Sequence, residues 1–165
     1  MTKNKELKIY RLCNSYTRQR GVVAVEMAVL VILMTLLMAG VFEFARAFWY
    51  YNALTKSTRD AARFMSNVSS TDIINSNNTN AAIATAKNLA LITANGANVK
   101  PALTASNIDI KCDSAACNGT KPSNVTVTII NFSVTIGSLF PFLSVPGGNY
   151  GSKTLSPSTT MRYMN

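Results

Sequence analysis

A run of about twenty almost entirely apolar residues constrains the fold of this chain more than any other feature. It extends from Val22 to Val41, and Glu26 is its single ionisable residue. A helix of about twenty residues is about 30 Å long, which matches the hydrocarbon thickness of a bilayer. A buried helix of a soluble protein is the alternative, but such helices are usually shorter and have a polar face. The run therefore predicts a transmembrane helix.

Charge and aromatic residues indicate the direction of this helix. The first 21 residues contain six Lys or Arg and one Glu, a net +5 of the chain's formal +9. Cationic segments stay on the cytoplasmic side of a membrane, so the N-terminus is expected inside. Aromatic residues follow the run, as is typical of the opposite interface: Phe44, Phe48, Trp49, Tyr50 and Tyr51. We therefore expect a single pass through a bacterial inner membrane, with everything after about residue 45 exported.

A cleavable secretory signal peptide is a competing interpretation of the same region. Ala45, Arg46 and Ala47 offer an A-x-A cleavage pattern behind a basic segment and an apolar one. The apolar run is longer than the usual signal core of about 7 to 15 residues, however, and the bulky Phe48 and Trp49 follow the supposed cut. A membrane anchor fits the pattern better.

The residues at the start of the run form a recognisable motif. A basic leader ends at Gly21, and Glu26 is the fifth residue after that glycine. This arrangement resembles type IV prepilins, in which a membrane-embedded prepilin peptidase cuts after the leader glycine. The resemblance implies cleavage between Gly21 and Val22, with Val22 as the new N-terminus.

Further motifs are similar to the TadE-like family of tight-adherence (Flp) pilus proteins. They are GVVAVE at 21–26, FEFAR at 42–46, AAR at 61–63, and TMRY at 160–163 after LFPFL at 139–143. Met27 departs from the aromatic residue that many Flp-type major pilins have there, so the match is to a minor pilin or pseudopilin. The resemblance implies a structural subunit in pilus biogenesis and surface adhesion. Its expected partners are the prepilin peptidase, other pilin subunits, the pilus assembly machinery and inner-membrane lipid.

Glu26 is costly in the membrane, by about 2.5 to 3.5 kcal/mol at the bilayer centre and less near the surface. After cleavage, the ammonium group of Val22 would lie about one helical turn from Glu26. A neighbouring subunit shifted by a few residues could then pair the two charges in lipid. The alternative is an ordinary signal anchor in which Glu26 reaches back to the cytoplasmic interface.

The helical pattern continues beyond the membrane to about Met65, followed by a loop at 66–80 that is rich in Ser, Asn and Thr. A second helix is predicted at Asn80–Asn95, with Gly96 as its C-cap. Four regions are therefore expected: a leader at 1–21, a transmembrane helix at 22–43, its extramembrane continuation at 44–66, and an exported α+β domain at 67–165.

Strands are predicted in the rest of that domain, giving an α+β fold with a small antiparallel sheet. Apolar and polar residues alternate at 108–110 and at 125–129, and a final strand is expected at Thr154–Tyr163. The parity of the apolar positions changes at Ile129 and Ile130, which predicts a β-bulge. A loop before the final strand is indicated by Pro141, Pro146, Gly147 and Gly148.

Two of the three cysteines, Cys112 and Cys117, lie between candidate strands in the exported domain. In an oxidising compartment they should form a disulfide that fastens the end of a hairpin. Their spacing lacks the CxxC pattern of redox-active pairs, and further metal ligands are missing from the sequence. Cys13 is expected to be a free thiol that is discarded with the leader.

Composition disfavours catalysis. The chain contains no histidine, which removes the usual proton shuttle and the commonest transition-metal ligand. We therefore expect no enzyme activity, no cofactor and no metal site. We also expect no nucleic-acid site, because the positive charge outside the leader is dispersed. A structural pilus subunit is the leading hypothesis. An uncleaved, membrane-anchored binding protein of the cell envelope is the alternative, and a membrane-bound hydrolase ranks last.

Overall fold

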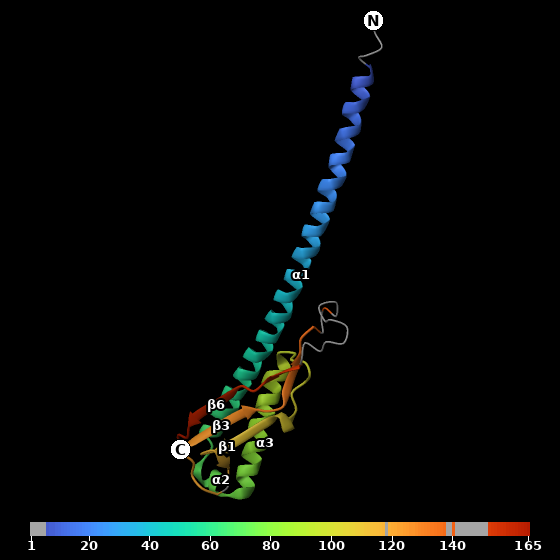
Figure 1. Ribbon diagram of the computed structural model, residues 1–165. Coiled ribbons are helices and arrows are strands. Elements are labelled where there is room, and N and C mark those ends of the chain that lie inside the picture. Colours follow the sequence, from blue (N-terminus) through green and yellow to red (C-terminus); the bar gives the residue numbers. More distant parts are fainter. Residues whose placement is uncertain (1–5, 118, 138–139, 141–151) are drawn as a thin grey trace. The chain divides into compact units, whose positions relative to one another are not determined.

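The computed structural model describes residues 6–117, 119–137, 140 and 152–165, and for residues 6–20 it describes the backbone alone. It divides the chain into two compact units, Met1–Phe42 and Glu43–Asn165. Both units contain part of one helix, α1 (Glu6–Ser66), which is shown in Figure 1. The predicted helix from Val22 to about Met65 is confirmed, and it begins earlier than expected, within the leader.

The apolar part of α1 has the length and composition of a membrane span. Its most apolar 18-residue window has a mean hydropathy of 2.6, and only 6% of that window is buried in the structure. A core helix of a soluble domain would bury most of such a surface against the rest of the protein. The exposed surface therefore favours a membrane anchor over a core helix.

Two further helices belong to the second unit, α2 (Ser70–Ile74) and α3 (Ser76–Gly96). They correct the prediction of a loop at 66–80. The segment folds because Ile73 is fully buried and because the hydroxyl of Thr79 donates to the carbonyl of Ile73 at 2.7 Å. Between the helices, the Asn75 side chain accepts the backbone N–H of Asn77, so one residue ends α2 and caps α3.

The second predicted helix is therefore confirmed as α3, with an earlier start. Gly96 was expected to cap it, but Gly96 is its last helical residue and Ala97 follows as the cap. The left-handed backbone conformation that glycine often supplies after a helix is adopted here by Asn98, with φ of 57°.

Strands form two antiparallel sheets. The larger has the order β2–β1–β3–β6, and its strands are β1 (Ile108–Cys112), β2 (Ala115–Ala116), β3 (Asn124–Ile129) and β6 (Ser158–Arg162). The smaller pairs β4 (Phe132–Thr135) with β5 (Ser152–Leu155). A short 3₁₀ helix, η1 (Ala105–Asn107), leads into β1. The α+β class with a small antiparallel sheet is confirmed.

The strand boundaries correct two predictions. The parity change near Ile129 and Ile130 is not a bulge in one strand, because β3 ends at Ile129 and the chain turns at Asn131, whose φ is 54°. The chain then continues as β4 in the smaller sheet. The final strand at 154–163 is instead two strands separated at Pro157, whose carbonyl accepts the N–H of Ile129. The predicted loop at 141–148 lies outside the described residues.

The core of the second unit lies between its helices and one face of the larger sheet. Residues alternate in β3, where Val125, Val127 and Ile129 are fully buried and Thr126 and Thr128 are only partly so. The buried residues form one cluster with both helices: Leu54, Ala61, Ala62 and Met65 of α1 and Ala86, Ala90 and Ala94 of α3. Small side chains in both helices permit close packing. Figure 1 shows α3 beside the strands.

Candidate functional site

The predicted processing residues lie together on the first unit's part of α1. Gly21 and Val22 are in continuous helix, and a Cβ atom at Gly21 would have no neighbour within 4 Å. Glu26 is exposed, four residues after Val22, which is one helical turn or about 6 Å along the axis. The carboxylate and the position of the predicted new N-terminus therefore share one side of the helix.

A second cluster, not expected from the sequence, occupies the start of the second unit. The side chain of Glu43 is 4% exposed, and its Oε2 lies 2.7 Å from Nη2 of Arg46, one turn later on α1. The same guanidinium donates to the carbonyl of Thr135 at 2.9 Å and lies 5.8 Å from the ring centre of Tyr50. These contacts attach the end of β4 to α1.

This buried ion pair is poorly signalled by sequence. Acidic and basic residues three apart on a helix are usually an exposed pair of small energetic value. Here the carboxylate is desolvated and the arginine also bonds a residue 89 positions away. The hint that the sequence offers is an acidic residue directly after a long apolar run, because a charge that is buried there requires a nearby partner.

The aromatic residues after the apolar run divide between two roles. The rings of Phe44 and Phe48 are exposed and stack with centroids 6.4 Å apart. Trp49 donates its indole N–H to the carbonyl of Ala97 at 3.2 Å, which joins α1 to the end of α3. Tyr50 is buried against the core. The exposed aromatic rings are those expected at a membrane interface.

The structure contains the predicted disulfide between Cys112 and Cys117, which closes the hairpin of β1 and β2. Within that hairpin the carboxylate of Asp113 accepts the backbone N–H groups of Ser123 at 2.7 Å and Asn124 at 2.8 Å. The cysteines and Asp113 therefore hold the entrance to β3 in place. This arrangement is structural, and within the described residues no three His, Cys, Asp or Glu side chains gather in a way that could hold a metal ion.

Residues after β6 bind the turn at the end of α1. The hydroxyl of Tyr163 donates to the carbonyl of Val68 at 2.5 Å, and the N–H of Met164 donates to the carbonyl of Ser66 at 3.0 Å. Burial and, secondarily, the nearby Asp72 carboxylate raise the pKa of the Tyr163 hydroxyl above its ordinary value. A tyrosine hydroxyl is protonated at neutral pH even without this shift, so it can act as the donor to Val68.

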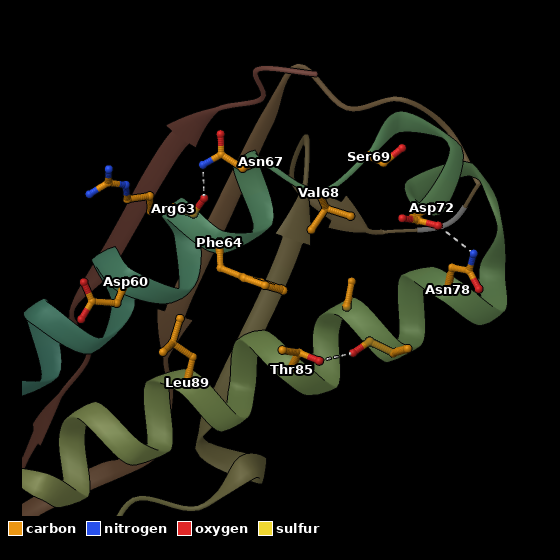
Figure 2. Close-up of a pocket in the computed structure, with 12 residues that line it drawn as sticks. Asp60, Arg63, Phe64, Asn67, Val68, Ser69, Asp72, Asn78, Thr85 and Leu89 are labelled. Atoms are coloured by element: carbon orange, nitrogen blue, oxygen red, sulfur yellow. Dashed lines mark hydrogen bonds between the residues drawn. The ribbon is translucent and has the colours of Figure 1, made fainter.

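A groove of about 930 Å³ lies between the last turns of α1, α2 and the first half of α3. Figure 2 shows Phe64 of α1 and Leu89 of α3 pointing into the space between the helices, beside Val68. Polar residues surround this apolar floor: Asp60, Arg63, Asn67, Ser69, Asp72 and Asn78. The sequence did not predict this groove, because its helix α2 was taken as loop.

Comparison with known proteins gave one family match. Residues 21–63 match the model of a family described as TadE-like protein, which confirms the resemblance drawn from the motifs at 21–26, 42–46 and 61–63. The motifs at 139–143 and 160–163 lie outside the matched residues. No curated protein and no solved structure matches the chain significantly. The match begins at Gly21 and includes Glu26, Glu43 and Arg46, so it contains both clusters on α1.

Proposed function

We propose that this chain, whose residues 21–63 match the TadE-like family, is a non-enzymatic structural subunit of a tight-adherence pilus. In this proposal it is a minor pilin or pseudopilin that a prepilin peptidase matures and that contributes to surface adhesion. The observation that carries the proposal is the position of Gly21 and Glu26. They stand at the head of an exposed apolar helix, and the family match begins at that same glycine.

The proposed mechanism begins with insertion. The apolar part of α1 holds the subunit in the inner membrane with the basic leader inside and the second unit exported. Cleavage after Gly21 then creates an ammonium group on Val22. In a bilayer this charge and the carboxylate of Glu26 are each costly alone, so pairing between neighbouring subunits favours a defined register.

N-terminal sequencing of the protein from its native host tests the proposed maturation. The mature chain should begin at Val22. An intact Met1 in cells with an active prepilin peptidase would overturn the proposal and favour an uncleaved anchored binding protein. A start at Phe48 would overturn it in favour of a secretory signal peptide.

Replacing the glycine tests the processing site itself. Gly21→Leu should leave a precursor that keeps its 21-residue leader, because a bulky side chain at the cleavage position would obstruct the peptidase. Gly40→Leu is the matched control, since Gly40 lies in the same helix and a Cβ atom there also has no neighbour within 4 Å. Mature protein of normal mass from Gly21→Leu would count against the site.

The role of Glu26 requires an assembly assay. Glu26→Gln removes the charge, so membrane insertion should persist while the amount of subunit recovered in pili falls. Glu26→Asp keeps the charge and should retain much more assembly than the glutamine variant. If pili incorporate Glu26→Gln at the normal level, the charge-pairing mechanism is wrong.

A further inference from the structure

The groove between α1 and α3 is lined by two carboxylates that form no salt bridge with the residues the structure describes. This unit contains five acidic residues, Glu43, Asp60, Asp72, Asp109 and Asp113. Glu43 pairs with Arg46, Asp109 contacts Lys111 at 3.4 Å, and Asp113 accepts the backbone N–H groups of Ser123 and Asn124 at the start of β3. The two that remain, Asp60 and Asp72, both line the groove.

Neither groove carboxylate forms an ion pair with any residue the structure describes. Asp72 accepts from the amide of Asn78 at 2.8 Å, and Asp60 has only a 3.5 Å contact with the hydroxyl of Thr93. Both side chains are partly exposed, at opposite ends of the apolar floor in Figure 2. With Arg63 also in the lining, the groove has a net charge of −1 in a unit that is basic overall.

The complementary surface lies on the same chain. Lys56 and Arg59 project from α1 just before the groove, both are exposed, and neither has an ion-pair partner among the described residues. We propose that the groove of one copy binds the Lys56 and Arg59 face of α1 from a second copy. This proposal rests on the proposed function, in which copies stand parallel in one membrane.

The two surfaces are displaced along α1. The groove uses residues between Asp60 and Asn67, from the end of α1 and the turn after it, whereas the cationic pair is centred about six residues earlier. At about 1.5 Å per residue, the second copy must be raised by about 9 Å for the surfaces to meet. Pairing Val22 of the raised copy with Glu26 of the lower one needs a shift of about 6 Å in the same direction. Both contacts therefore require the second copy to be raised, the groove contact by about 9 Å and the Val22 to Glu26 pairing by about 6 Å.

Such a contact joins two different surfaces and does not close on itself. Contacts of this heterologous kind generate open-ended assemblies when the rotation between copies does not close a ring. The groove would thus position successive subunits outside the membrane.

Cysteine cross-linking of the full chain in membranes tests this contact. Two differently tagged copies are produced together in a Cys13→Ser background, one with Ala81→Cys in the groove and one with Thr55→Cys beside the cationic pair. The mixed disulfide should exceed, by at least about fivefold, that of Thr55→Cys with Asn124→Cys, an exposed position at the start of β3. Equal yields, or mainly Ala81 to Ala81 cross-links, would overturn the proposal.

Charge reversal separates this contact from simple proximity. Asp60→Lys with Asp72→Lys in the groove copy should lower the mixed disulfide at least about fivefold, and Lys56→Asp with Arg59→Asp in the other copy should restore it. Retention of the Cys112–Cys117 disulfide checks that the variants fold. Leader cleavage is measured in the same samples. Normal cleavage without rescue refutes the groove contact alone, whereas absent cleavage refutes the proposed function.

Discussion

Arg46→Met should be among the most destabilising single changes in the second unit. It removes the 2.7 Å ion pair to Glu43, the 2.9 Å bond to the carbonyl of Thr135 and the contact with the Tyr50 ring. Deleting one member of a buried ion pair costs about 3 to 5 kcal/mol, because the other charge stays desolvated. The arginine side chain is 18% exposed, so we expect the lower end, about 3 kcal/mol. Total stabilities are commonly about 5 to 15 kcal/mol.

The measurement is urea unfolding of the full chain in detergent, followed by fluorescence of Trp49. This is the chain's single tryptophan, and its bond to Ala97 reports the contact between α1 and α3. Glu43→Leu combined with Arg46→Met is the matched control. Replacing both charges with apolar side chains also removes the buried Glu43 carboxylate that Arg46→Met leaves without its arginine, so this variant should be at least about 2 kcal/mol more stable than Arg46→Met. If the double variant is as unstable as the single one, burial of the Glu43 charge without Arg46 is not the cause of the destabilisation.

Two further changes probe the rest of the second unit. Tyr163→Phe removes the bond to Val68 and should lower the free energy of unfolding by about 1 kcal/mol. Because the pKa of Tyr163 is raised in the folded state, its hydroxyl contributes full stability at pH values below the ordinary pKa of 10.0. This contribution is lost as pH rises through the folded-state pKa. The free energy of unfolding of the phenylalanine variant, measured in urea, should therefore decline less at alkaline pH. Cys112→Ser with Cys117→Ser should cost about 2 kcal/mol in the same assay under oxidising conditions, because the disulfide closes only a short loop. An unchanged urea midpoint would show that the bond contributes little.

Local pattern was sufficient to predict the elements whose residues repeat regularly. The long apolar helix follows from the length of an uninterrupted apolar run. The helix around Ala86 and Ala90 and the strand at Val125–Ile129 follow from periodicity. Periodicity failed at 66–80, where the many Ser, Asn and Thr residues resemble a loop. There the Asn75 side chain caps α3, and the Thr79 hydroxyl donates to carbonyls of α2. It also failed near Ile130, since a parity change marks either a bulge or a change of sheet, and tertiary pairing decides which.

The features of the candidate site also differ in how far the sequence could predict them. Gly21, Glu26 and the cysteine pair were identifiable because each depends on short spacing along the chain. The contact of Arg46 with Thr135 spans 89 positions, and the groove joins residues from three helices. No local motif encodes such proximity, so only the folded arrangement could reveal these features.

The segment after β6 binds the end of α1, so the second unit can be completed only when this last part of the chain is available. Tyr163 bonds a residue 95 positions earlier, and β6 pairs with the edge of β3 opposite β1. If the chain crosses the membrane from its N-terminal side, β3 emerges well before β6 and waits with one edge unpaired. Exposed edges of this kind invite pairing with other chains. The interval between the emergence of these two strands is therefore when the free edge of β3 is most open to pairing with another chain.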